Sequence, residues 1–123
     1  MDDRRLKVSQ SATIDEYEIA LALSPDDPEL MNNLAWTMVT RENVTPREKS
    51  RALLLAGRAV EIKPAAHILD TLAEALYVNG RYEEALEVGS QAMEKLGPKD
   101  DRTHFEKQLE KFKQALGEPA ERP

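Results

Sequence analysis

The stretch LDTLAEALYVNGRYEEALEVGSQAMEKLGP, from Leu69 to Pro98, decides the fold class of this chain. Small residues recur in it, since Ala73 precedes Ala85 by 12 residues and Ala85 precedes Ala92 by 7. Two antiparallel helices that pack closely need small side chains where their axes approach, and leucines beside them fill the remaining space. The stretch therefore predicts a pair of packed helices that ends at the proline.

Similar spacing occurs upstream, which indicates a repeat. Three prolines, Pro25, Pro64 and Pro98, each end an apolar stretch, and they lie 39 and 34 residues apart. The residue before a proline is pushed out of the helical region, so each proline is expected to end a helix. Five or six residues before each proline stands an alanine: Ala20, Ala59 and Ala92. Repeats of this length stack similar helix pairs on one another.

These residues resemble the tetratricopeptide repeat family, and segment 67–98 carries the pattern best. Its stretch NGRYEEAL, 79–86, is similar to the family's turn between paired helices. We expect Gly80 to adopt the left-handed conformation that ends a helix, and Tyr82 to pack back across the turn. The stretches MNNLAW, 31–36, and LDTLAEAL, 69–76, resemble bacterial members of the family.

The resemblance covers roughly residues 14–99 and implies an all-α fold, a right-handed superhelical stack of antiparallel helix pairs. A second copy begins PELMNNLAW and ends AGRAVEIKP, and a half copy, EYEIALALSPDD, precedes it. The chain is thus expected to be one domain over 1–117, with a half repeat at about 4–27, repeats at 28–65 and 66–99, a capping helix at 100–116, and a disordered tail at 118–123. The six helices are expected at about 4–23, 28–40, 46–63, 66–79, 82–96 and 101–116.

The first full repeat departs from the better copy in its loop. Ala35 and Ala52 are 17 residues apart where the better copy has 12, and the surplus falls in TRENVTP, which indicates a longer loop. Thr45 and Glu48 at its end have capping-box spacing, in which each side chain satisfies a backbone N–H that the helix leaves free. Asp27 is the expected cap of the preceding helix.

Side-chain bulk also varies between the copies. Tyr17 stands three residues before Ala20, whereas Ala56 and Gly89 hold the equivalent places, so we expect closer helix approach there. The last helix has one narrow apolar stripe on an otherwise polar surface, which suits a helix that seals the end of a stack. The stripe consists of Phe105, Leu109, Phe112 and Leu116.

Composition limits the classes of partner. The net charge of −6 and the lack of a basic stripe argue against nucleic acid. No run approaches the ~18 apolar residues of a membrane span, and the charged start does not resemble a signal peptide. The chain has no cysteine, which excludes disulfides but assigns no compartment. We expect a soluble protein, cytoplasmic or periplasmic, without direct membrane insertion.

Catalytic chemistry is not expected from this sequence. It contains none of the common nucleophile, phosphate-loop or zinc-protease motifs, so we expect neither an enzyme nor a cofactor. His67, Asp70 and Glu74 share one helix face and could together ligate a metal ion. The favoured interpretation is instead a solvated concave face, because three ligands on one helix make an incomplete site.

Recognition of another protein is the expected function. In the family that the chain resembles, the first helix of each pair lines a concave groove that holds a peptide or a partner's helix. Asparagine can hold a peptide backbone through donor and acceptor, and Trp36 and Tyr77 offer broad contact area. Both aromatics could alternatively pack between helix pairs. The candidate peptide-binding residues are Asn32, Asn33, Trp36, His67, Asp70, Thr71, Glu74 and Tyr77, with Val39 as a weaker candidate.

The partner segment is expected to be polar or basic. Family members that clamp the C-terminal carboxylate of a chaperone use several basic residues, and although Asn33 matches one clamp place, Thr71 stands where a basic residue would be needed. Carboxylates in the groove would repel such a tail. An alternative function is a regulatory or targeting appendage of a larger enzyme or membrane protein.

The N-terminal edge offers a second interaction surface. The half copy lacks its partner helix, so either residues 1–13 extend the helix and cover the gap, or the edge is open. An open edge would expose apolar surface around Ile14, Tyr17 and Leu21, and such surface favours association with a second copy. We therefore expect homodimers through this edge.

Overall fold

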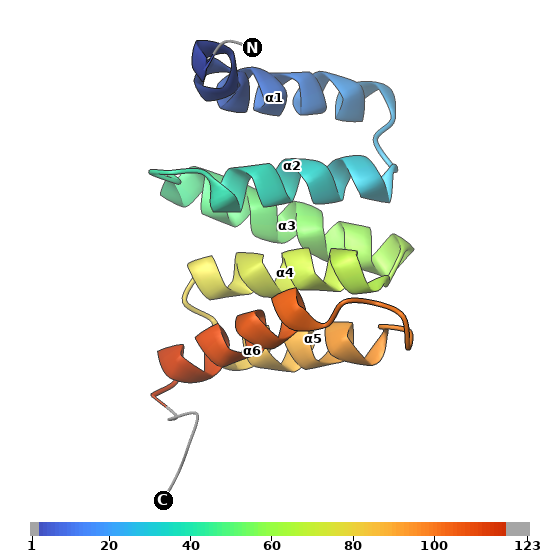
Figure 1. Cartoon of the computed structure of the whole chain (residues 1–123). Helices are drawn as coiled ribbons and strands as arrows, with labels where there is room; N and C mark the ends of the chain where they lie inside the picture. Colours follow the sequence, from blue (N-terminus) through green and yellow to red (C-terminus); the bar gives the residue numbers. More distant parts are fainter. Residues whose placement is uncertain (1–2, 118–123) are drawn as a thin grey trace, which may run out of the picture.

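The structure, a computed structural model, describes the backbone of residues 3–117 and the side chains from Thr13 onward. The described chain is entirely helical and contains no strand, which confirms the all-α class (Figure 1). The predicted tail at 118–123 lies outside the described residues. The helices are α1 (Asp3–Leu23), α2 (Pro28–Thr40), α3 (Pro46–Ile62), α4 (Ala66–Val78), α5 (Tyr82–Glu94) and α6 (Thr103–Ala115).

The helix ends follow the local chemistry of the sequence. Asp27 caps α2 by accepting a hydrogen bond from the backbone N–H of Glu29 at 2.9 Å. Thr45 and Glu48 form the predicted capping box at the start of α3, with backbone-to-side-chain distances of 3.1 and 3.0 Å. Gly80 adopts the left-handed conformation, with φ of 79°, between α4 and α5. All three predictions are confirmed. Each of them depends only on residues that are close to one another in the sequence.

The helices stack in chain order, as Figure 1 shows. Helix α2 pairs with α3 and α4 with α5, while α3 packs against α4 and joins the two pairs. The first helices of the two pairs, α2 and α4, also contact each other, and α4 contacts α6. Helices α2, α4 and α6 therefore follow one another along one side of the stack, and this side carries the candidate site.

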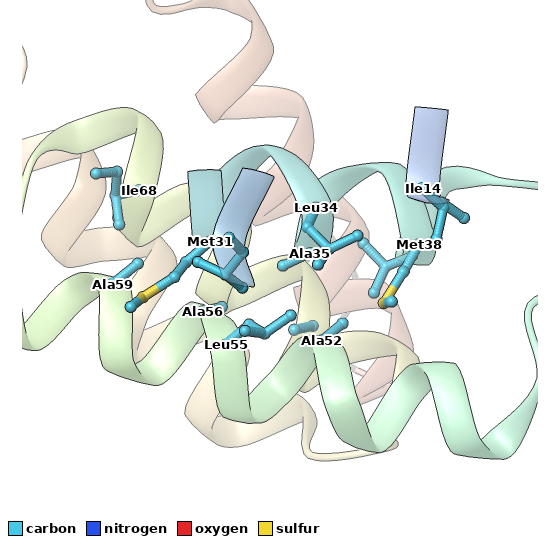
Figure 2. Close-up of a cluster of buried hydrophobic side chains, with 13 residues drawn as sticks. Ile14, Met31, Leu34, Ala35, Met38, Ala52, Leu55, Ala56, Ala59 and Ile68 are labelled. Carbon is cyan, nitrogen blue, oxygen red and sulfur yellow. The ribbon is translucent and has the colours of Figure 1, made fainter. Parts of the chain in front are cut away.

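Small residues lie where the helices approach, as the sequence predicts. Ala35, Ala59, Ala73 and Ala92 have no exposed surface. In Figure 2, the alanines of α3 lie opposite the larger side chains of α2, among them Met31. An alanine at such a point lets a neighbouring helix come near while the larger side chains fill the space beside it.

Helix α6 fills the space left by the small residue Gly89. A Cβ at Gly89 would lie 2.9 Å from Cδ2 of Leu109 and 3.1 Å from the ring of Phe112. Phe112 is fully buried and belongs to the predicted apolar stripe of this helix. Burial of one such ring stabilises the fold by about 1.5–3 kcal/mol. The last helix is thereby fixed against α5 and beside α4.

The N-terminal edge differs from the sequence expectation. Residues from Asp3 onward continue α1 as one helix, and Ile14 and Leu21 are only 9% and 8% exposed. Both side chains belong to the core that α1 shares with α2, since residues seven apart lie on the same helix face. Of the two alternatives for this edge, the structure therefore shows the extended helix, and the exposed apolar surface that an open edge would have at Ile14 and Leu21 is not present. Among the side chains of α1 that the structure describes, from Thr13 onward, the exposed large apolar ones are Ile19 and Leu23.

Candidate binding hollow beside α2 and α4

Helices α1, α2 and α4 surround an open hollow of about 310 Å³. We use the name "the hollow" for the space lined by Tyr17, Asn32, Asn33, Trp36, Thr37, His67, Asp70 and Thr71. Of the eight candidate residues predicted from the sequence, the structure brings six together there. These six are Asn32, Asn33, Trp36, His67, Asp70 and Thr71.

Helical periodicity explains this grouping. On α2, residues 32 and 36, like residues 33 and 37, are four apart and lie above one another on the same face. On α4, His67, Asp70 and Thr71 share a face for the same reason. Sequence reasoning missed Thr37, although its spacing from Asn33 could have identified it, and it missed Tyr17, which reaches the hollow from α1.

Asn32 is an unusual residue of the hollow. Its side chain is 7% exposed, and its carboxamide oxygen Oδ1 has no hydrogen-bond partner among the described residues. The other buried carboxamide, that of Gln108, donates hydrogen bonds to two carboxylates. A buried acceptor without a partner costs about 1–3 kcal/mol, and most folds avoid it. Asn32 is thus a polar group whose hydrogen-bonding capacity the fold itself does not use.

Two threonines of the hollow have already used their hydroxyl donors. Thr37 donates to the backbone carbonyl of Asn33 at 2.8 Å, and Thr71 donates to the carbonyl of His67 at 3.1 Å. A hydroxyl has one donor and two acceptor lone pairs. Each threonine oxygen can therefore still accept a hydrogen bond but has no second proton to donate.

An ion-pair cluster stands at one end of the hollow. Lys63 contacts the carboxylate of Glu29 at 2.7 Å, and Nε2 of His67 lies 3.1 Å from the same carboxylate. The hydrogen bond from Lys63, followed by that from His67, lowers the pKa of the Glu29 carboxyl below its ordinary value. The cluster ties the start of α2 to the start of α4, and thus holds together the two helices that line most of the hollow.

Helix α6 covers the remaining part of the predicted site. Nε2 of His104 lies 2.7 Å from Asp70, and Gln108 donates to Asp70 at 3.2 Å and to Glu74 at 3.1 Å. Lys111 adds an ion pair with Glu74 at 2.7 Å. Asp70 and Glu74 are only 6% and 7% exposed, so the prediction of a solvated face is wrong at both positions. The sequence-based interpretation missed that polar side chains of α6 reach back to α4.

The aromatic candidates lie in different surroundings. Tyr77 lies beyond the hollow, and the centroid of its ring is 5.5 Å from that of the Phe112 ring. The Lys111 ammonium lies 4.6 Å from the centroid of the Tyr77 ring. Trp36 is half-buried, lines the hollow, and meets the ring of His104 edge-on at 6.1 Å. Trp36 thus offers an accessible aromatic surface at the hollow, whereas Tyr77 packs against α6. Val39, the weaker candidate, is buried in the core.

Two further findings concern the described residues as a whole. No three of their histidine and acidic side chains come together as a group that could hold a metal ion. None of their helices is long and apolar enough to cross a membrane. In comparisons with known proteins, no family model matches the chain and no curated protein matches its sequence.

Proposed function

We propose that this protein is an interaction module that binds a polar or basic segment of another protein at the hollow. The observation that carries the proposal is the unpartnered carboxamide oxygen of Asn32, which is buried in the wall of the open hollow that the half-buried ring of Trp36 also lines. Aromatic side chains with little freedom to lose are frequent anchors of protein interfaces. A buried polar group without a partner gains a full hydrogen bond when a ligand supplies the missing donor.

The size of the hollow fits part of a polypeptide. Its volume of about 310 Å³ lies at the lower end of the range for ligand sites, about 300–1,000 Å³. One side chain with its neighbouring backbone is a suitable occupant. The exposed carboxamide of Asn33 stands at its rim, where it can both donate to and accept from a peptide backbone.

Membership of the tetratricopeptide repeat family, with its right-handed superhelical path, is part of this proposal. The residues that carry the resemblance support it, and so does the order of helix contacts, in which each pair packs on the next. The proposed binding surface is the side of the first helices, α2 and α4. This surface corresponds to the groove that the resemblance implies.

Selection from a library of short random peptides tests the proposed function. Peptides selected on the intact domain are measured again on Trp36→Ala and on Asn33→Asp, with Gln91→Ala as a matched control because Gln91 is exposed on α5. We expect each of the first two variants to weaken binding about tenfold or more, the usual cost of losing an interface anchor, and the control to bind normally. Equal peptide binding by the wild type and the three variants would show that the peptides bind at another surface, and would refute the proposal.

A further inference from the structure

The hollow presents mainly groups that accept hydrogen bonds or attract positive charge. The hydroxyl oxygens of Thr37 and Thr71 retain lone pairs after donating to their own helices. Oδ1 of Asn32 has no partner in the described part of the chain and almost no accessible surface, so a ligand reaches it only after the carboxamide turns toward the hollow. The carboxylate of Asp70 also lines the space. A ligand that complements this set must carry several donors.

Asp70 has capacity beyond its present partners. One of its oxygens contacts His104 and the other accepts from Gln108. An ionised carboxylate has about four lone-pair sites, so about two remain for a ligand. Asp70 is 6% exposed, and a charge so far from water interacts strongly with a cation that enters the hollow.

The aromatic residues of the hollow add a second kind of attraction. Tyr17 and Trp36 approach from α1 and α2, and aromatic faces attract cations. No lysine or arginine is among the described side chains that line the hollow; the basic groups in or beside it are the imidazole of His67, which contacts Glu29, and that of His104, which contacts Asp70. Lys63 and Lys111 are paired with Glu29 and Glu74.

We propose that the hollow binds the guanidinium group of an arginine in the partner segment. The inference rests on the proposed function and specifies its ligand. A guanidinium has five N–H donors and no acceptor, and its plane stacks on aromatic rings. A lysine ammonium offers three donors from a strongly hydrated point charge and matches the several acceptors less well. A carboxylate would be repelled by the carboxylate of Asp70 and is excluded.

Changing the ligand tests this inference without any risk of unfolding the protein. The probes are the peptides selected on the domain, resynthesised with each arginine replaced by citrulline, which keeps the shape but removes the charge and replaces two of the five N–H donors with a carbonyl acceptor. A third set carries lysine at the same place. Trp36 is the only tryptophan of the chain, so its fluorescence reports directly on the hollow.

We expect the selected peptides to be enriched in arginine and to change the Trp36 fluorescence saturably. Citrulline should weaken binding about 10–100-fold, and lysine should have an intermediate effect. Asn32→Leu should weaken binding of the arginine peptide by about tenfold or more and that of the citrulline peptide less, because citrulline keeps fewer N–H donors and no charge.

Each other outcome has a distinct meaning. Selected peptides that lack arginine, or that bind equally well with citrulline, would overturn the arginine inference and leave the proposed function standing. A selection that yields no peptide sensitive to Trp36→Ala would overturn both. If Asn32→Leu weakens the binding of the arginine and citrulline peptides equally, Asn32 holds the peptide backbone. That result would overturn the part in arginine recognition that is assigned to Asn32.

Discussion

Replacement of Asn32 by leucine should stabilise the protein while it weakens binding. The two side chains have the same number of heavy atoms and the same branching, so leucine fits the same space. The substitution removes an acceptor that is 7% exposed and lacks a partner, which costs the wild type about 1–3 kcal/mol. Leucine also favours a helix over asparagine by up to about 0.5 kcal/mol. We expect the free energy of unfolding to rise by about 1–2 kcal/mol.

The matched control is the same substitution at Asn79. Its amide donates to the carbonyl of Lys49 at 2.9 Å and to that of Ala75 at 2.7 Å, and so ties the end of α4 to α3. Asn79→Leu removes both hydrogen bonds, including the one that joins α4 to α3. We therefore expect it to lower the free energy of unfolding by about 1–3 kcal/mol.

Thermal and urea denaturation followed by circular dichroism measures both variants beside the wild type. The midpoint temperature of Asn32→Leu should rise by roughly 3–10 °C, and that of Asn79→Leu should fall. Stabilising substitutions at binding sites commonly cost function, so higher stability together with weaker binding would mark Asn32 as a binding residue. If Asn32→Leu destabilises the fold as Asn79→Leu does, then Asn32 supports the structure and the reasoning is refuted.

Three further predictions concern the scaffold. Gly57→Ala, with no atom within 4 Å of the new Cβ, should stabilise the protein by about 0.5–1 kcal/mol in urea denaturation. The Gly89→Ala variant should be about 1–3 kcal/mol less stable than the Gly57→Ala variant, because α6 occupies the space beside Gly89. Equal effects of the two substitutions would contradict this packing. Thr45→Ala should cost about 0.5–2 kcal/mol in the same assay by removing the cap of α3, and an unchanged midpoint would show that the cap is dispensable. The hydrogen bond from Lys63 lowers the pKa of Glu29 in the folded state. The ionised Glu29 therefore contributes to the free energy of unfolding, by at most about 1 kcal/mol for an exposed pair. This contribution is complete above the pKa of Glu29 in the unfolded chain and is lost as the pH falls through its pKa in the folded protein. Melting temperatures between about pH 3 and 7 should therefore fall less steeply on acidification in Glu29→Gln than in the wild type, and identical slopes would remove this role.

The helices and their ends could be predicted from the sequence because their causes are local. Thr45 and Glu48 are three residues apart, and Gly80 meets the conformational demand of a single turn. The face shared by Asn33 and Trp36 follows from helical periodicity alone. In each case the residues that decide the structure lie within about two helical turns of one another.

The remaining features depend on contacts between distant parts of the chain. His104 and Gln108 reach Asp70 from 34 and 38 residues away, and no local pattern encodes the distance over which α6 folds back. The same applies to the surroundings of Asn32, since the hollow that it lines is formed by α1 and α4 as well as by α2. Asp70 and Glu74 were assigned to a solvated concave face, and packing against α6 buries them.

The central claim is that the side of α2 and α4 binds a protein segment. Amide chemical shifts of the labelled domain, recorded while a selected arginine peptide is added, test it most directly. The largest changes should lie on residues 32–37 and 67–71 and on the indole N–H of Trp36. Changes concentrated on the opposite side, around Leu54 of α3 or Gln91 of α5, would contradict the account.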